Sequence, residues 1–273
     1  DLTITGAGTL NATDLGTTQS KDVANLSKLY IRDTTINVTQ AADARRSSEW
    51  NGECVLDGSA KVTYVSSTNH AALNLAQTNG VSIPDDSKLY CLHTDASNPS
   101  DYAVDGLAAY GAPITLQDNA YLEAEGRNST GKNIGSAIVC DVDITVKYNA
   151  AIKATAYGVA ISTWGNVKVD GGKIIAKSAN SNGIYADSAI SISNGATVEA
   201  EGHYPAVFGN GGVTITNSTV KAGSDDDVAI FSPADVTIRD SVIKATSPDN
   251  RDGIRARGTA TITGSWIETS GKE

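Results

Sequence analysis

Two neighbouring stretches decide the fold of this chain: residues 183–202 read GIYADSAISISNGATVEAEG, and residues 206–223 read AVFGNGGVTITNSTVKAG. Each stretch contains three short segments in which apolar and polar residues alternate, and turn-forming residues separate the segments. Alternation with a period of two is typical of β-strands with one buried face. Ile184 and Val207 hold the same place in the two stretches, so the pattern repeats after 23 residues.

The repeat extends through the second half of the chain. The central apolar residue of the first segment recurs at steps of 23 or 24 residues, as Ile138, Ile161, Ile184, Val207, Ile230 and Ile254. Three strands in each step indicate a parallel β-helix, in which each coil bonds to the next about 4.8 Å along the axis. A sandwich of β-hairpins is the alternative all-β fold, but it does not require a constant step.

The first half follows the pattern less regularly. Leu29–Ile31 and Ile36–Val38 resemble the second and third strands of a coil, whereas the coil that contains Val62 has no clear register. Wider spacings predict insertions at 39–53, 93–106 and 125–135. We therefore predict one β-helix domain over residues 1–273, with irregular coils over 1–136 and regular 23-residue coils over 137–270. This length corresponds to roughly ten or eleven coils.

Composition and charge limit the possible functions. The chain has 3 Trp, 10 Tyr, 2 Phe and no Met among 273 residues, so Ile, Val, Leu and Ala must form its core. The formal net charge of −10 argues against nucleic acid and anionic membranes as partners, because both require clustered Lys and Arg. No apolar run reaches the length of a membrane span.

The cysteines predict neither a disulfide framework nor a zinc site. Cys54, Cys91 and Cys140 are an odd, scattered set without CxxC spacing. Cys140 falls on an inward position that Ala186, Gly209 and Ala256 hold in other coils, so we expect it to be a small core residue.

The unit DGIRARGTATITGSWIET at residues 252–269 resembles the coils of right-handed parallel β-helix proteins of the pectate-lyase-like superfamily. Its pattern is most similar to the cell-surface carbohydrate-binding β-helix proteins of Gram-positive bacteria. The resemblance covers about residues 107–270 well and residues 1–106 loosely. It implies a right-handed coil, which the general preference for right-handed parallel crossovers also favours. Function is implied more weakly, because coil sequences converge under the same packing demands.

Outward positions of the first strand carry the candidate binding residues. Aromatic side chains recur there at coil spacing, and acidic or amide side chains lie beside them. A sugar ring can stack on an aromatic surface while carboxylates and amides bond its hydroxyls. The set comprises Trp164, Tyr185, Phe208, Phe231, Asp141, Asp187 and Asn210. The alternative is that these aromatics cap a turn or lie under a loop or a partner.

A second candidate site overlaps the first. Lyases of this superfamily, which the chain resembles, use carboxylate-bound Ca²⁺ to neutralise a uronate and a Lys or Arg as the base. Lys168 is the corresponding candidate base, and calcium requires several oxygen ligands. The candidate ligands are Asp141, Asp143, Asp170 and Asp187. Asp at turns and surface ion pairs are the simpler explanation of the same residues.

We expect a non-catalytic polysaccharide-binding or adhesion module as the function. A calcium-dependent polysaccharide lyase is the main alternative, and a structural stalk is the third. The resemblance implies a secreted or cell-surface location, with a surface glycan as partner and no nucleic acid or inserted membrane. Asp1 does not begin a signal peptide, so the chain is expected to be either cytosolic or a mature or trimmed fragment. The last strand leaves an open edge, so we expect either that the chain is part of a larger surface protein or that something caps this end.

Overall fold

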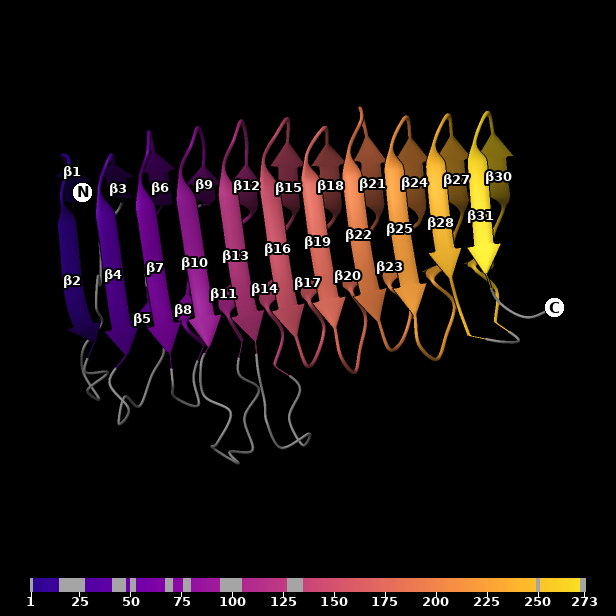
Figure 1. Cartoon of the computed structure of the whole chain (residues 1–273), viewed down its shortest axis with the longest axis horizontal. Coiled ribbons are helices and arrows are strands. Elements are labelled where there is room, and N and C mark those ends of the chain that lie inside the picture. The colour runs from indigo at the N-terminus through magenta and orange to yellow at the C-terminus, as the bar shows by residue number, and fades with distance from the viewer. Residues whose placement is uncertain are drawn as a thin grey trace.

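Three parallel β-sheets run along the long axis of the chain, and successive coils contribute one strand to each of them (Figure 1). The computed structural model describes residues 2–14, 28–40, 48–49, 53–66, 71–75, 80–93, 105–126, 135–248 and 251–270. Within these ranges every pairing between strands is parallel, which confirms the predicted parallel β-helix. The described ranges contain no helix that is long and apolar enough to cross a membrane.

We name the three sheets by their strands. The short-strand sheet consists of β5 (Ser48–Glu49), β8 (Leu73–Asn74), β11 (Leu107–Ala109), β14 (Ile138–Cys140), β17 (Ile161–Thr163), β20 (Ile184–Ala186), β23 (Val207–Gly209), β26 (Ile230–Ser232) and β29 (Ile254–Ala256). The middle sheet consists of β1 (Leu2–Thr5), β3 (Lys28–Arg32), β6 (Glu53–Asp57), β9 (Val81–Ile83), β12 (Ile114–Leu116), β15 (Ile144–Lys147), β18 (Val167–Asp170), β21 (Ile190–Ser193), β24 (Val213–Thr216), β27 (Val236–Arg239) and β30 (Ala260–Thr263). The long-strand sheet consists of β2 (Thr9–Asp14), β4 (Thr35–Gln40), β7 (Lys61–Ser66), β10 (Lys88–His93), β13 (Tyr121–Gly126), β16 (Ala151–Ala156), β19 (Lys173–Ser178), β22 (Thr197–Gly202), β25 (Thr219–Ser224), β28 (Val242–Thr246) and β31 (Trp266–Ser270).

The described ranges contain nine complete coils, fewer than the ten or eleven that the sequence predicts, because the two coils of β1 and β3 have no described strand in the short-strand sheet. The middle and long-strand sheets have eleven strands each and the short-strand sheet has nine, so nine coils in the described ranges have all three strands. From β14 to β29 the short strands begin at steps of 23 or 24 residues. The regular half therefore has the constant step that its sequence predicts.

The structure fixes the register of the irregular half. Val62 on β7 pairs with Ile36 on β4, and Leu89 on β10 pairs with Val62 from the other side. Strand β5 lies inside range 39–53, so the prediction that this whole range is an insertion is wrong. The remaining parts of the three predicted insertions, residues 41–47, 50–52, 94–104 and 127–134, lie outside the described residues.

Aliphatic ladders fill the interior between the sheets. Ile161, Ile184 and Val207 are in register on neighbouring coils, and each is fully buried. Neighbouring strands are about 4.8 Å apart, so stacked branched side chains contact one another directly. Tyr64 is the aromatic residue in the buried core of the described chain. The interior is thus the Ile, Val, Leu and Ala core that the composition predicts.

The three cysteines belong to this core. Cys54, Cys91 and Cys140 are buried free thiols. Burial raises the pKa of the Cys140 thiol to about 11, so the thiol is protonated at neutral pH. The prediction that Cys140 is a small core residue is confirmed.

One turn position adopts the left-handed conformation in coil after coil. It lies between the middle and long-strand sheets, and its non-glycine occupants with positive φ include Asp85, Asp118, Asn194 and Asp240. Asn and Asp tolerate this conformation better than other residues with a side chain. The Asn194-Gly195 pair, in which both residues have positive φ, is one of the turns that the sequence indicates.

Serines, two of them buried, close the same turn in the later coils. The Ser241 hydroxyl donates to the Arg239 carbonyl at 2.6 Å and accepts the backbone N–H of Ser218 at 3.2 Å. The Ser265 hydroxyl in turn accepts the N–H of Ser241 at 3.1 Å. These hydroxyls bond backbone groups that the strand ladders leave unpaired, so they stabilise the turn between two sheets.

Substitution of Ser241 by alanine is expected to lower the free energy of unfolding by about 1–3 kcal/mol. The change leaves the Ser218 N–H without its acceptor in a place where the Ser241 side chain is 3% exposed. Urea unfolding followed by circular dichroism measures the loss. Ser191→Ala, on the outward face of β21, is the matched control and should change stability by less than about 0.5 kcal/mol. Equal losses in the two variants would contradict the role of the buried hydroxyl.

Candidate functional site

Three aromatic residues of the candidate face form a ladder on the outside of the short-strand sheet. Tyr185, Phe208 and Phe231 are in register on β20, β23 and β26. The rings of Tyr185 and Phe208 are stacked, with centroids 5.1 Å apart and an angle of 7° between the planes. Phe231 meets Phe208 edge to face, with centroids 5.4 Å apart. The predicted column of aromatics at coil spacing therefore exists.

The stacking decides which ring faces remain available. Tyr185 and Phe208 turn flat faces toward each other along the axis, so they present their edges to solvent and do not form a continuous flat platform. The guanidinium of Arg257 lies 5.7 Å from the centroid of the Phe231 ring, so a cation occupies that end of the ladder. At the other end, the residue in register with Tyr185 is the small Ser162. The ladder therefore has its open end at Tyr185.

Trp164 is the exposed aromatic residue beside this open end. It follows β17 directly, and 65% of its surface is exposed. The backbone N–H of Trp164 donates to the carbonyl of Cys140 in the preceding coil. The backbone N–H of Asp187, in the following coil, donates to the carbonyl of Thr163. Asp141 and Asp187 therefore hold the same turn position as Trp164, one coil away on either side. The backbones of Asp141 and Asp187 are therefore each one coil, about 4.8 Å, from that of Trp164.

Hydrogen bonds orient the polar groups on the coils that flank Trp164. Asp187 Oδ1 accepts the Asn210 amide at 3.2 Å and the Tyr185 hydroxyl at 3.4 Å. Burial and the Asp187 carboxylate both raise the pKa of Tyr185, so its hydroxyl stays protonated at neutral pH. On the other side, the backbone N–H of Gly111 donates to Asp141 at 2.5 Å. The column thus presents oriented carboxylates, an amide and a phenol on the coils on either side of Trp164.

Tyr110 belongs to the same column, although the sequence did not single it out. Tyr110 is 40% exposed. The next residue in the column is Asp141, because its backbone N–H donates to the carbonyl of Ala109, the residue before Tyr110. Burial is the main cause of its raised pKa, and Asp105 and Asp141 contribute further. The signal was present in the sequence, because Leu107-Ala108-Ala109-Tyr110 aligns with residues 138–141. The insertions around that coil concealed it.

The candidate lyase base Lys168 lies outside this site. It projects from β18 on the middle sheet and forms an ion pair with Asp143, with 2.6 Å between Nζ and Oδ2. Asp143 also accepts two bonds of 2.8 Å from the N–H and the amide of Asn166. Burial alone would raise the pKa of Asp143, but Lys168 and Asn166 outweigh it and lower that pKa. Asp143 and Lys168 are thus the surface ion pair that the sequence offered as the simpler explanation.

The candidate calcium ligands do not assemble. In the part of the chain that the structure describes, no three carboxylate, imidazole or thiol side chains lie close enough together to hold a metal ion. Asp170 ends β18, at the corner between the middle and long-strand sheets, and bonds Asn194. Asp141 and Asp187 follow short strands, at the corner between the short-strand and middle sheets. The prediction that Asp141, Asp143, Asp170 and Asp187 form one cluster is therefore wrong, because they belong to two different corners.

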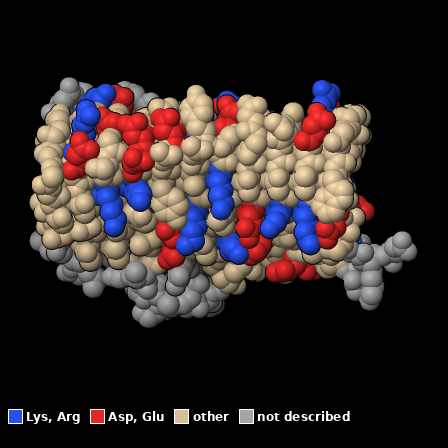
Figure 2. All heavy atoms as spheres, turned by 45° about the horizontal axis from the view of Figure 1, so that its top comes forward, with Lys and Arg blue, Asp and Glu red and all other residues tan. Residues whose placement is uncertain are grey.

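A separate acidic corner lies at the turn between the middle and long-strand sheets. Asp57 accepts the hydroxyl of Tyr30 and the N–H of Gly58, and the Tyr30 bond lowers the pKa of Asp57. Asp85 hydrogen-bonds Asp57, which raises the pKa of Asp85. Figure 2 shows acidic side chains gathered over the N-terminal coils at this corner, with charges of both signs on the neighbouring sheet. The corner is thus a hydrogen-bonded turn cluster.

No family model matches this chain, and neither the curated proteins nor the solved structures contain a match to it. The arrangement of its own residues is therefore the basis for any functional proposal.

Proposed function

We propose that the chain is a polysaccharide-binding module whose contact residue is Trp164. The observation that carries the proposal is the 65% exposure of Trp164, whose turn position is occupied by Asp141 in the preceding coil and by Asp187 in the following one. An exposed indole costs solvation free energy unless a ligand covers it, and the apolar face of a pyranose suits its flat surface. The two carboxylates and the Asn210 amide can bond the hydroxyls at the ring periphery.

The column that contains Trp164 also favours an extended ligand. Tyr110, Asp141, Trp164, Asp187 and Asn210 follow one another along the axis, one residue for each coil. A glycan that lies parallel to the axis can therefore meet a new side chain at every coil, whereas a small molecule would use only one or two. Long polymers are for this reason better ligands than monosaccharides.

Charge and resemblance support the biological setting of the proposal. The net charge of −10 disfavours nucleic acid and anionic membrane as partners. The resemblance of residues 252–269 to cell-surface carbohydrate-binding β-helices supports a location outside the cell or on its surface. The ion-paired Lys168 adds no specific support for a lyase.

Replacement of Trp164 by alanine is expected to weaken polysaccharide retention about tenfold or more. Loss of one stacked aromatic side chain removes on the order of 1–3 kcal/mol of binding free energy, by analogy with the stacking of nucleobases on aromatics. Affinity electrophoresis against a panel of neutral and acidic polysaccharides measures retention. The melting temperature should stay within about 2 °C of the original, because the indole is exposed.

Trp266→Ala is the matched control, since Trp266 is 57% exposed on β31 of the long-strand sheet. It should leave retention unchanged. Equal loss in both variants would indicate non-specific adsorption through exposed tryptophan. If the unaltered chain binds no polysaccharide in the panel, the proposal fails and the structural-stalk alternative gains support.

A further inference from the structure

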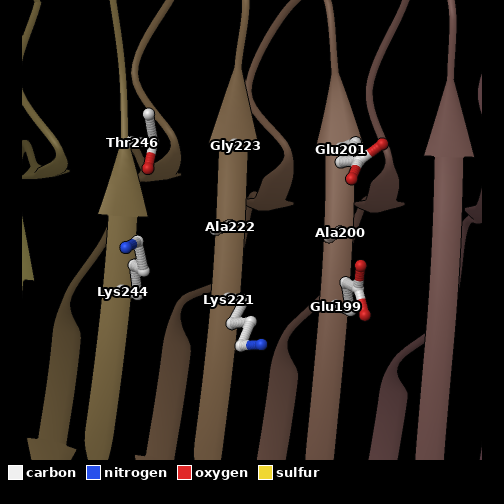
Figure 3. Close-up of a pocket in the computed structure, with 8 residues that line it drawn as sticks. All are labelled: Glu199, Ala200, Glu201, Lys221, Ala222, Gly223, Lys244 and Thr246. Carbon is white, nitrogen blue, oxygen red and sulfur yellow. The ribbon is translucent and has the colours of Figure 1, made fainter. Parts of the chain in front are cut away.

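A shallow hollow interrupts the outer face of the long-strand sheet across β22, β25 and β28. Figure 3 shows Ala222 and Gly223 in its middle, Lys244 and Thr246 on one side, and the strand that carries Glu199 and Glu201 on the other. Lys221 lies at one end, with its side chain bent toward the strand of Glu199. The volume of the hollow is about 170 Å³. This is below the range of about 300–1,000 Å³ typical of drug-sized ligands, so the hollow suits one small polar unit.

Gly223 creates the hollow. It is in register with Glu201 on one side and Thr246 on the other, so it holds the outward position between two longer side chains. A Cβ added to Gly223 would meet nothing within 4 Å, and its φ is not in the left-handed region. The backbone conformation therefore does not require glycine. What the glycine provides at this position is open space.

The charges around the hollow are unevenly paired. Lys177 binds Glu201 at 3.0 Å, and Lys244 binds Glu268 at 3.0 Å. In the described chain Lys221 forms no such ion pair, although it is in register with Glu199 and Lys244. Glu199 already lies 4.0 Å from Lys177, and Lys244 already has its partner in Glu268. The Lys221 ammonium can therefore accept a bound anion as its partner.

The remaining groups suit hydroxyls. Glu199 and Glu201 are acceptors on one side, and the Thr246 hydroxyl can donate or accept on the other. An inorganic anion would gain only the ammonium and would meet two carboxylates nearby. A ring with one carboxylate and several hydroxyls can place the carboxylate at Lys221 and donate hydroxyl hydrogens to the glutamates.

We propose that this hollow binds a single hexuronate unit, with its carboxylate at Lys221 and its hydroxyls between Glu199 and Thr246. The site lies on a different sheet from Trp164 and does not depend on the proposed role of that residue. If both sites bind, one chain would contact a glycan through two faces of its coil.

The test is a titration of the isotopically labelled chain with sodium glucuronate, followed by amide shifts in NMR spectra at low salt. Shifts should gather on β22, β25 and β28, with weak, millimolar affinity. Glucose should shift the same amides at least about fivefold more weakly, because it lacks the carboxylate. Inorganic sulfate as potent as glucuronate would overturn the proposal, since it would show that charge alone accounts for binding.

Two variants sharpen the test. Gly223→Thr fills the hollow without altering charge, suits a strand, and is expected to abolish the shifts while the fold is retained. Lys221→Gln should weaken binding about fivefold or more, whereas Lys153→Gln removes an equal charge from the same sheet and should have no effect. Unchanged binding in Gly223→Thr would refute the site. Trp164→Ala should leave glucuronate binding intact, which separates this result from the polysaccharide test.

Discussion

Replacement of Ile184 by alanine is expected to lower the free energy of unfolding by about 2–5 kcal/mol. Ile184 is fully buried in the ladder between Ile161 and Val207. The backbone ladders hold the coils at a fixed distance, so the neighbours cannot move in to fill the space of the missing side chain. The loss therefore combines the transfer free energy of the removed groups with the cost of a cavity.

Ile175→Ala is the matched control for Ile184→Ala. Ile175 faces outward on β19 and is partly exposed, so the same chemical change should cost less than about 1 kcal/mol there. Urea unfolding followed by circular dichroism compares the two variants. A loss at Ile184 as small as that at Ile175 would mean that the aliphatic ladder does not control the stability of the coil.

Stability is expected to fall as pH rises from about 4 to about 7, because of Asp105. Its carboxyl group precedes β11 and accepts the N–H of Ser136 at 2.8 Å. Burial raises the pKa of Asp105 to about 6, and the Ser136 bond only partly opposes this. The ordinary value in an unfolded chain is about 3.9.

The direction follows from the two pKa values. Below about pH 4 the group is protonated in both states, so the folded chain bears no cost. As pH rises through 6 the unfolded chain is already ionised, and the folded chain must either keep the proton or ionise a buried group. The stability lost over this interval is at most about 3 kcal/mol, since each pKa unit corresponds to about 1.4 kcal/mol.

Asp105→Asn tests this assignment, because an amide oxygen can still accept the Ser136 N–H. Urea unfolding at several pH values between 4 and 7 measures both chains. The asparagine variant should match the original near pH 4 and exceed it in stability at pH 7. A difference between the chains that stays constant across this interval would assign the pH dependence to other groups.

The coil repeat made the fold predictable from the sequence. Ile138, Ile161 and Ile184 recur at a fixed step because each must fill the same place in the interior. The period of the sequence is therefore the number of residues in one coil. Strands β5 and β8 escaped prediction because two residues are too few to show alternation. The insertions beside them also removed the constant step.

The candidate site was predictable only in part. Register placed Trp164 between Asp141 and Asp187, since outward positions follow from inward ones. The face-to-face packing of Tyr185 on Phe208 depends on the side-chain rotamers of the two residues, which cannot be predicted from the period of the sequence. The hollow at Gly223 was also missed, because it requires comparison of one outward position over three coils, where the informative residue is the one without a side chain.

The uneven strand lengths have a mechanical consequence. Backbone hydrogen bonds run from coil to coil, so a pulling force along the axis passes through every interface between coils in series. Among the described residues, the short-strand, middle and long-strand sheets contribute two, three and four residue pairs between the coils of β9 and β12, against three, four and five between the coils of β18 and β21. The interface with the fewest paired residues should separate first, so forced extension should open the N-terminal half and leave the regular coils folded.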